Sequence, residues 1–383
     1  MLVAVWLSGG LACTLDTSLK HRCQTSADCL SGRVCVRSVC QAPSNTSPHP
    51  NVMFVTSKKY PTRFQPLEAA DDKCNAAAEA GGLSGDYRAW LSTAATYARD
   101  RLAGARGWVR TDGVPFADTP DDIAAGRIMS PPMFDEFGRR VYLSVEAGQE
   151  LVATGTNEFG LNDPGQNCHD WANDDATSLT AGTTSGTAGV WTKAAAAPCG
   201  VPMRIYCFGV DQTYALVPPS IEGKRAFLSE KTFMQTDRLA AADATCAEDA
   251  AAVGLSGTFL ALLSTSATPA GARFAGATPA TWFRLDGVAL NSPGADLFHQ
   301  DVLLAPLNVT ARGDYVSYDA ALTGSAMPLS IGELAYDCND WTFNQAAETG
   351  ELGVAGNIVR VDLWFDEQLL SCDGPRRVYC FER

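Results

Sequence analysis

The stretch WVRTDGV, from Trp108 to Val114, returns later in the chain as WFRLDGV, from Trp282 to Val288. Five more pairs of blocks stand around it in the same order: FVTSK 54–58 with FLSEK 227–231, GLSG 82–85 with 254–257, LST 91–93 with 263–265, CHDW 168–171 with CNDW 338–341, and RIYCF 204–208 with RVYCF 377–381. The offset is always 170 to 174 residues. Self-similarity at a fixed period marks a repeated structural unit. The sequence therefore predicts a tandem duplication.

Each copy begins with a strand and then a pattern of small apolar residues at helical spacing. In the first copy the predicted helical face consists of Leu67, Ala70, Cys74 and Ala77. Pro66 suits its first position, and Gly81-Gly82 its end. In the second copy the face is Leu239, Ala242, Cys246, Ala250 and Val253, with a stop at Gly254. We expect a second helix over 95–103, with a counterpart beginning at Pro269.

Cysteine usage points to an oxidising compartment. The chain has 13 cysteines but only four histidines, and no CxxC pair. Zinc sites usually combine CxxC pairs or histidines, whereas exported proteins pair their cysteines as disulfides. We therefore expect disulfides, no metal site and no cofactor.

The first twelve residues, 1–12, are apolar and uncharged, which is typical of the core of an export signal. They are too few to span a bilayer as a helix. Gly10-Leu11-Ala12-Cys13 resembles a bacterial lipoprotein cleavage site, so Cys13 is predicted to carry lipid. Twelve cysteines remain to pair with one another after Cys13. The alternatives are a spare thiol or a Cys13 that pairs within the next segment.

Residues 13–50 form a predicted cysteine-rich motif and linker. The spacing Cys-x5-Cys-x5-Cys-x4-Cys over Cys23, Cys29, Cys35 and Cys40 resembles the small Dickkopf-like motif. So short a segment cannot bury a useful core, and two bridges are expected to hold it. The Pro- and Ser-containing stretch 41–50 is predicted to be a linker.

In each copy one cysteine lies on the first helix, two in the second half and one in the last strand. This order resembles the C-type-lectin-like fold and its endostatin-like branch. The FVTS, GLSG, CxDW and RIYC blocks more closely resemble a bacterial family of exported lipoproteins without an established activity. The resemblance implies an α+β class with two tandem, disulfide-stapled C-type-lectin-like domains, at 51–209 and 225–383, joined by a linker at 210–224. We call these domains the first and the second repeat.

The resemblance also implies the disulfide pairing. In this fold the helix cysteine pairs with the last-strand cysteine, and the middle two pair with each other. The implied bridges are Cys74–Cys207, Cys168–Cys199, Cys246–Cys380 and Cys338–Cys372.

Sugar-binding members of the superfamily hold calcium through oxygen ligands that follow a tryptophan ahead of the third cysteine. Here Trp191 is followed by Thr192-Lys193 and Trp364 by Phe365-Asp366, so the paired ligands are missing. Oxygen ligands for calcium could instead come from acidic residues of one loop, although solvated turns are the commoner role of such residues. These residues are Asp163, Asp170, Asp174 and Asp175.

No sequence pattern of an enzyme is present, and we expect none of the residues to be catalytic. His169 next to Asp170 is replaced by Asn339 in the second repeat, while Asp340 and Trp341 are kept. We therefore expect Asp170 and Asp340 to bind backbone amides of their loops. Arg204 and Arg377, in the last strands, are expected to be structural.

The net charge of −14 makes nucleic acid an unsuitable partner. The chain is therefore interpreted as a secreted or lipid-anchored surface module that binds an unknown protein or glycan and meets the membrane only through its anchor. A structural envelope lipoprotein without a specific ligand is the alternative, and an envelope hydrolase is disfavoured. The repeats diverge most over 114–166 and 288–337, where a ligand site is expected, although drift without function would produce the same divergence.

Overall fold

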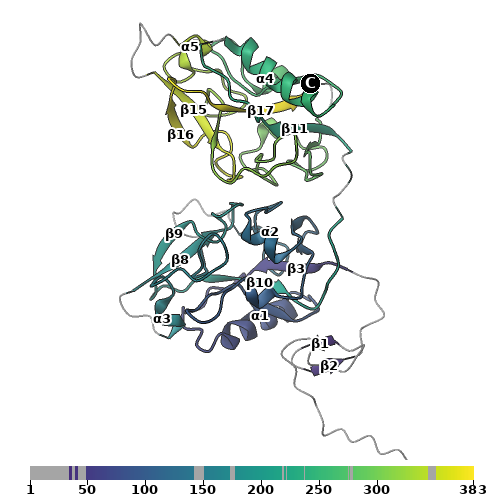
Figure 1. Cartoon of the computed structure of the whole chain (residues 1–383), viewed down its shortest axis with the longest axis vertical. Coiled ribbons are helices and arrows are strands. Elements are labelled where there is room, and N and C mark those ends of the chain that lie inside the picture. Colours follow the sequence, from purple (N-terminus) through teal and green to yellow (C-terminus); the bar gives the residue numbers. More distant parts are fainter. Residues whose placement is uncertain are drawn as a thin grey trace, which may run out of the picture. The chain divides into compact units, whose positions relative to one another are not determined.

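The structure is a computed structural model of the chain (Figure 1). It describes residues 34–36, 39–41, 49–141, 151–172, 177–217, 220, 222–236, 238–274, 276, 279–343 and 351–383. The chain divides into two compact units, 1–47 and 48–383. In the first, β1 (Val34–Val36) pairs antiparallel with β2 (Val39–Gln41), with Cys35 opposite Cys40. The predicted export signal, Cys13, Cys23 and Cys29 lie outside the described residues.

The first repeat contains one eight-stranded sheet with β10 at its centre. Its order is β6-β5-β3-β10-β7-β8-β9, and β4 also pairs with β10. The strands are β3 (Asn51–Val55), β4 (Tyr87–Ala89), β5 (Trp108–Arg110), β6 (Pro115–Ala117), β7 (Leu151–Ala153), β8 (Ser178–Thr183), β9 (Ala195–Pro198) and β10 (Arg204–Gly209). The helical segments are α1 (Glu68–Ala80), η2 (Asp100–Leu102), α2 (Pro120–Ala124) and α3 (Cys168–Trp171).

The second repeat contains a seven-stranded sheet with the corresponding order β13-β11-β17-β14-β15-β16, and β12 pairs with β17. The strands are β11 (Lys224–Leu228), β12 (Phe259–Ala261), β13 (Trp282–Arg284), β14 (Ala320–Leu322), β15 (Leu352–Asn357), β16 (Gln368–Ser371) and β17 (Arg377–Glu382). The helical segments are α4 (Arg238–Ala252), η3 (Gly271–Phe274), η4 (Leu297–His299) and α5 (Cys338–Trp341). The predicted mixture of helix and sheet is confirmed, and the duplication extends to strand order.

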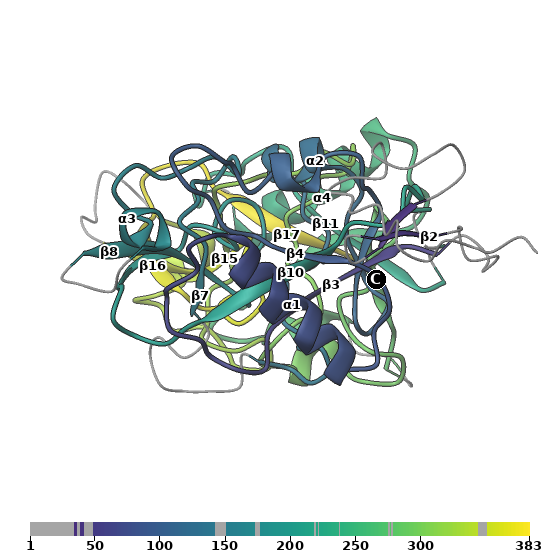
Figure 2. The same cartoon turned by 90° about the horizontal axis from the view of Figure 1, so that it is seen from below.

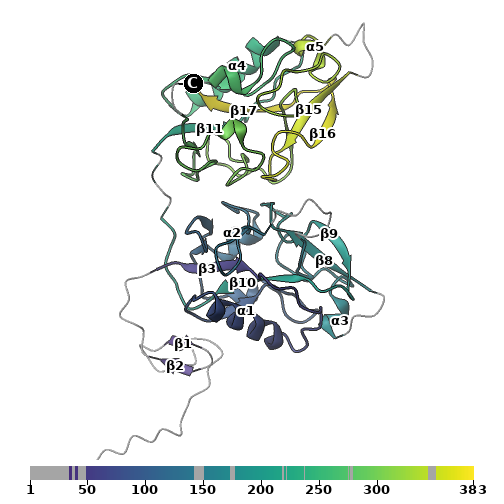
Figure 3. The same cartoon turned by 180° about the vertical axis from the view of Figure 1, so that it is seen from behind.

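The first predicted helix of each repeat is confirmed, although α1 begins at Glu68 and not at Pro66, and Val253 is exposed beyond the end of α4. On α1 the residues Ala70, Cys74 and Ala77 are buried, and the helix lies across its sheet (Figure 2). On α4, which lies beside β17 in Figure 3, the buried residues include Ala242, Cys246 and Ala250. The glycines that end these helices, Gly82 and Gly254, both have a φ of +72°, a conformation that side chains with a Cβ disfavour.

The prediction of a second long helix over 95–103 is wrong, because only the short segment η2 forms there. Hydroxyl side chains satisfy the backbone N–H groups in front of it. The N–H of Thr96 donates to Thr93 Oγ1 at 3.0 Å, and that of Ala98 donates to Ser92 Oγ at 2.9 Å. Such local bonds compete with a helix ladder. The second repeat likewise has only η3 after Pro269.

Alternation along the strands builds a core on both faces of each sheet. In the first repeat Phe54 and Cys207 belong to a cluster with α1, whereas Met53, Val55 and Tyr206 belong to a cluster on the opposite face. The second repeat follows the same pattern. There Phe227 and Cys380 lie with α4, while Ala226, Leu228 and Tyr379 lie on the other side.

Part of the predicted linker 210–224 is bound to the first repeat. Asn51 Nδ2 donates to the carbonyl of Gln212 at 2.8 Å, and its Oδ1 accepts from the N–H of Gln212 at 3.1 Å. The N–H of Leu216 donates to Asp118 Oδ1 at 2.9 Å. Residues 210–216 therefore continue the first repeat instead of leaving it freely.

The repeats contact each other through equivalent loops, between β8 and β9 and between β15 and β16. Gly186 and Arg360 form an antiparallel bridge, in which Thr187 N donates to Val359 O at 2.9 Å and Val361 N to Ser185 O at 3.0 Å. Ala188 shares an apolar cluster with Val359 and Val361. Since the paired loops occupy the same place in each repeat, this contact has the form of an isologous interface.

Candidate functional site

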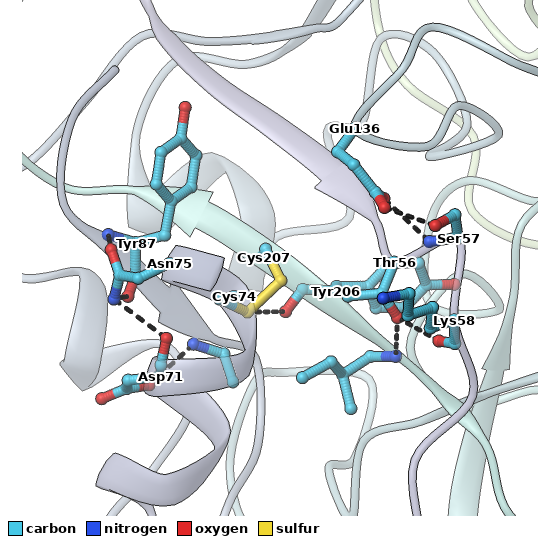
Figure 4. Close-up of a disulfide and its surroundings, with 12 residues drawn as sticks. Thr56, Ser57, Lys58, Asp71, Cys74, Asn75, Tyr87, Glu136, Tyr206 and Cys207 are labelled. Carbon is cyan, nitrogen blue, oxygen red and sulfur yellow. Dashed lines mark hydrogen bonds between the residues drawn. A yellow bond between two sulfur atoms is a disulfide. The ribbon is translucent and has the colours of Figure 1, made fainter. Parts of the chain in front are cut away.

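Four disulfides join the pairs implied by the family resemblance, so that part of the prediction is confirmed. Cys74–Cys207 (Figure 4) and Cys246–Cys380 tie the first helix of each repeat to its last strand, across separations of 133 and 134 residues. Cys168–Cys199 and Cys338–Cys372 close the shorter loops. The described side chains do not include Cys13, Cys23, Cys29, Cys35 and Cys40, so lipidation and the N-terminal bridges stay predictions.

Oxidised cysteines in this number indicate an extracellular or otherwise oxidising environment. Among the described residues, no helix is long and apolar enough to cross a membrane.

The segments between the second and third cysteine begin with an unusual turn. All four residues of α3, Cys168 to Trp171, have φ values between +53° and +65°, and those of α5, Cys338 to Trp341, have values between +53° and +59°. Neither segment contains glycine, and the left-handed conformation costs roughly 1–2 kcal/mol per residue. Surrounding contacts must therefore hold both turns in place.

The aspartates of these turns provide such contacts. Asp170 Oδ1 accepts from the N–H of Ala94 at 2.8 Å, and Asp340 Oδ1 accepts from that of Ser266 at 2.7 Å. Both aspartates bind backbone amides, as predicted, but these amides belong to the segments after β4 and β12 and not to the aspartates' own loops. His169 is exposed and one residue from Asp170, whose carboxylate is engaged by the Ala94 amide.

The tryptophans that close the turns are completely buried. Trp171 Nε1 donates to Ser92 O at 2.8 Å, and Trp341 Nε1 donates to Ser264 O at 2.9 Å. A Cβ on Gly155 would lie 2.7 Å from the Trp171 ring, so the close approach requires glycine. In each repeat the CxDW block therefore binds the LST block, and this contact explains why both blocks are kept in the two repeats.

The repeated WVRTDGV block contains a buried arginine. Arg110 and Arg284 are 1% and 0% exposed. Arg110 Nη2 lies 2.7 Å from Asp112, and Nη1 donates to Pro131 O at 3.1 Å. Arg284 repeats the ion pair, with Asp286, and donates to Pro306 O at 2.9 Å. The sequence predicts no role for this arginine beyond the repeat itself, although its charged partner at i+2 beside apolar residues is a signal for a buried pair.

Burial affects the two pairs differently. In the first repeat, the burial of Arg110 lowers its pKa by more than the charge and hydrogen bond of Asp112 raise it. In the second, burial would raise the pKa of Asp286, but the charge and hydrogen bonds of Arg284 and the hydroxyl of Tyr315 outweigh it and lower that pKa. Both arginines bind carbonyls of the following loop, which is a structural role.

The last strands carry structural arginines, as predicted. Arg204 Nη1 donates to the carbonyl of Thr56 at 2.6 Å. Arg377 Nη1 donates to the carbonyl of Glu230 at 3.0 Å. Each arginine therefore fastens the segment that follows the opening strand of its repeat.

The acidic loop weighed as a calcium site is used internally where it is described. Asp163 accepts from Thr180 Oγ1 at 2.6 Å and lies 3.4 Å from Lys193. Asp174 and Asp175 lie outside the described residues. In the described ranges, no three His, Cys, Asp or Glu side chains are grouped so that they can hold a metal ion.

The second repeat has a cavity of about 260 Å³ beside Trp364. We call it the Asp366 cavity. Its buried aromatic lining comes from Phe298, Trp364 and Phe365, which are at most 7% exposed. The other lining residues are the polar His299, Gln300, Asp301, Asp362 and Asp366 and the apolar Ala326, Met327 and Pro328.

The carboxylates of this cavity differ in their partners. Asp362 lies 2.6 Å from Arg360. His299 lies 2.8 Å from Asp296, a carboxylate that does not line the cavity. Within the described part of the chain, no ion pair is present for Asp301 or Asp366. Partial burial raises the pKa of Asp366. A nearby cation would favour its ionised form.

In the first repeat, charged side chains of the repeat itself form ion pairs at the equivalent position. Trp191 corresponds to Trp364, so Lys193 stands where the second repeat has Asp366. Lys193 Nζ lies 3.6 Å from Glu158 and 3.4 Å from Asp163. Gly189 lies against Glu158, and a Cβ there would be only 2.8 Å from Glu158 Cβ. Its counterpart in the second repeat is Asp362, a cavity residue.

Two smaller hollows lie on the first repeat. One, of about 170 Å³, is lined by Asn51, Tyr87 and Asp211 among others, and the second, of about 210 Å³, by Leu151, Ala197 and Met203 among others. Only part of the predicted ligand region lines the Asp366 cavity, because residues 298–301 and 326–328 fall within 288–337 but Asp362 and Asp366 follow it.

A scan with models of known protein families finds no match to this chain, and a search of curated proteins finds none either.

Proposed function

We propose that the chain is a non-enzymatic binding module of two C-type-lectin-like domains, which is secreted or anchored at the cell surface through Cys13. The observation that carries the proposal is the Asp366 cavity. It lies on a scaffold fixed by two disulfides and a buried arginine in each repeat. Binding sites commonly sit in the variable loops of such rigid scaffolds.

The second repeat is the proposed binding domain, and the first is the partner domain that supports it. Their scaffold contacts match, whereas the side chains next to Trp191 and Trp364 do not. In the first repeat Lys193 satisfies its acidic neighbours. In the second repeat the corresponding position, Asp366, lines an open cavity.

The test is a binding screen of the whole exported chain against a glycan array and against surface proteins. We expect a ligand that is lost on Asp366→Lys and retained by Asp314→Lys, which makes the same charge change at an exposed residue that does not line the cavity. Absence of any ligand would favour the structural envelope protein. Turnover of an envelope polymer by the purified chain would contradict the proposal.

A further inference from the structure

We propose that the Asp366 cavity receives a lysine or arginine side chain of a protein partner whose neighbouring residues are apolar. This inference rests on the proposed binding function and specifies the partner as a basic, apolar peptide segment instead of a glycan.

The first step of the argument is charge. Asp301 and Asp366 are exposed at the cavity and have no ion pair in the described ranges. The described acidic groups are not gathered closely enough to hold one metal ion. A cationic side chain differs from a metal ion, since it can pair with one carboxylate at a time and requires no closed coordination shell.

The second step is the equivalent place in the first repeat. There an ammonium group, Lys193 Nζ, already lies within 3.6 Å of two carboxylates. In the second repeat the lysine is replaced by Asp366, and Glu158 by Met327. The second repeat has no lysine at this position, and Asp301 and Asp366 line the space, so the cavity is complementary to a cation supplied by a partner.

The third step is the apolar wall. The aliphatic stem of a lysine or arginine packs on apolar surface while its charge stays near water. Phe298, Phe365 and Met327 offer such a surface beside Asp366. A dianionic or sulfated ligand would be repelled by the same carboxylates.

The fourth step is the segment that continues from the cavity wall. Residues 327–336 expose large apolar side chains, with exposed fractions of 41% to 54%: Met327, Leu329, Ile331, Leu334 and Tyr336. The equivalent stretch of the first repeat, Glu158–Gln166, exposes only one large apolar side chain among its described residues, Phe159. Clustered exposed apolar residues mark protein interaction sites. Together with the acidic cavity, this segment matches a peptide that combines basic and apolar residues.

The test uses the whole chain and labelled ten-residue peptides in a fluorescence anisotropy titration. The probes alternate Lys with Leu, Glu with Leu, or Lys with Ser. We expect the Lys–Leu peptide to bind more tightly than either of the others, and its affinity to fall as salt is raised. Asp366→Lys should weaken the Lys–Leu peptide about tenfold or more, which is the loss of about 1.4 kcal/mol.

Two controls make the result decisive. Asp314→Lys carries the same charge change and should leave the affinity within about twofold, because it does not line the cavity. Met327→Ser should weaken the Lys–Leu peptide but not the Lys–Ser peptide, since it removes only apolar contact. Circular dichroism and intact disulfides verify that each variant is folded.

An equal loss in Asp366→Lys and Asp314→Lys would overturn the inference, because binding would then reflect general charge. Calorimetric binding of Ca²⁺ alone that Asp366→Lys abolishes would also overturn it. Binding of a glycan or protein that does not respond to Asp366→Lys would refute this inference while leaving the proposed binding function intact. No ligand in any assay would remove both.

Discussion

In the first repeat Lys193 pairs with Glu158 and Asp163, whereas in the second repeat Asp366 stands at the same position beside an open cavity. Away from this place the repeats keep the same strand order, disulfides and left-handed turns. The contacts that stabilise the scaffold occur in both repeats, whereas the ion pairs of the loop residue Lys193 occur only in the first. The comparison therefore separates residues needed for folding from residues free to acquire binding chemistry.

The largest expected effect comes from removing the long disulfide of one repeat. Cys74→Ser with Cys207→Ser opens a separation of 133 residues, and Cys246→Ser with Cys380→Ser one of 134. Each double substitution should lower the free energy of unfolding by about 4–5 kcal/mol in the chain-entropy model. Urea unfolding measures the loss. A large difference between the two double variants would break the equivalence of the repeats.

Removing the buried arginine should have the next largest effect. Arg110→Met and Arg284→Met each leave an aspartate and a loop carbonyl without their partner. We expect a loss of about 3 kcal/mol for Arg284→Met, the usual scale for breaking a buried pair, and a smaller loss for Arg110→Met because Asp112 is exposed.

Arg127→Met provides the control for these variants. It removes a pair with Asp122 in which the arginine side chain is 49% exposed, and should cost less than about 1 kcal/mol. If all three variants unfold at the same urea concentration, the structural role of the WVRTDGV block is refuted.

A pH effect should distinguish the turns that the repeats otherwise share. Burial and the negative charge of Asp340 raise the pKa of Asp337 to about 6, although the N–H of Asp340 donates to it. The first repeat has Asn167 at this position, whose Nδ2 donates to Asp170 at 2.6 Å. In Asp337 the corresponding atom, Oδ2, is buried without a hydrogen-bond partner.

The sign of this effect follows from linkage. Because the folded pKa is above the unfolded one, the contribution of Asp337 is most favourable below about pH 4 and is lost as pH rises through about 6. Asp337→Asn should therefore stabilise the protein at pH 7 by about 2–3 kcal/mol and much less at pH 4. Asn167→Asp should do the opposite. Thermal melts at both pH values measure this, and a pH-independent gain would argue against the assignment.

The smallest effect on stability is expected at the position where the repeats differ in charge. Lys193→Met removes two ion pairs in which the lysine side chain is 43% exposed. Exposed pairs contribute less than about 1 kcal/mol, so the loss of stability should stay within that limit. A loss of several kcal/mol in chemical unfolding would place Lys193 in the scaffold and weaken the contrast with Asp366.

The sequence was sufficient for features that depend on order and local period. The duplicated blocks, α1 and α4 and the amide contacts of Asp170 and Asp340 could all be predicted. Part of the segment assigned as linker proved to bind the first repeat, because the contact of Gln212 with Asn51 joins residues far apart in sequence. The pairing of cysteines followed from family resemblance rather than from spacing.

Other features arise from contacts that the sequence does not display. The hydroxyl bonds of Ser92 and Thr93 replace a helix that the residue pattern favours. The left-handed turns need a disulfide and a buried tryptophan to hold non-glycine residues. The Asp366 cavity combines residues from 298 to 366, and no linear motif marks their meeting.

Peptide mapping of the exported chain under non-reducing conditions tests the duplication most directly. Two repeats that fold as equivalent scaffolds should yield the crosslinked peptides Cys74–Cys207 and Cys246–Cys380, together with Cys168–Cys199 and Cys338–Cys372. Recovery of these four pairs is the result that we predict. Crosslinks between the repeats, such as Cys74 with Cys380, would contradict the account.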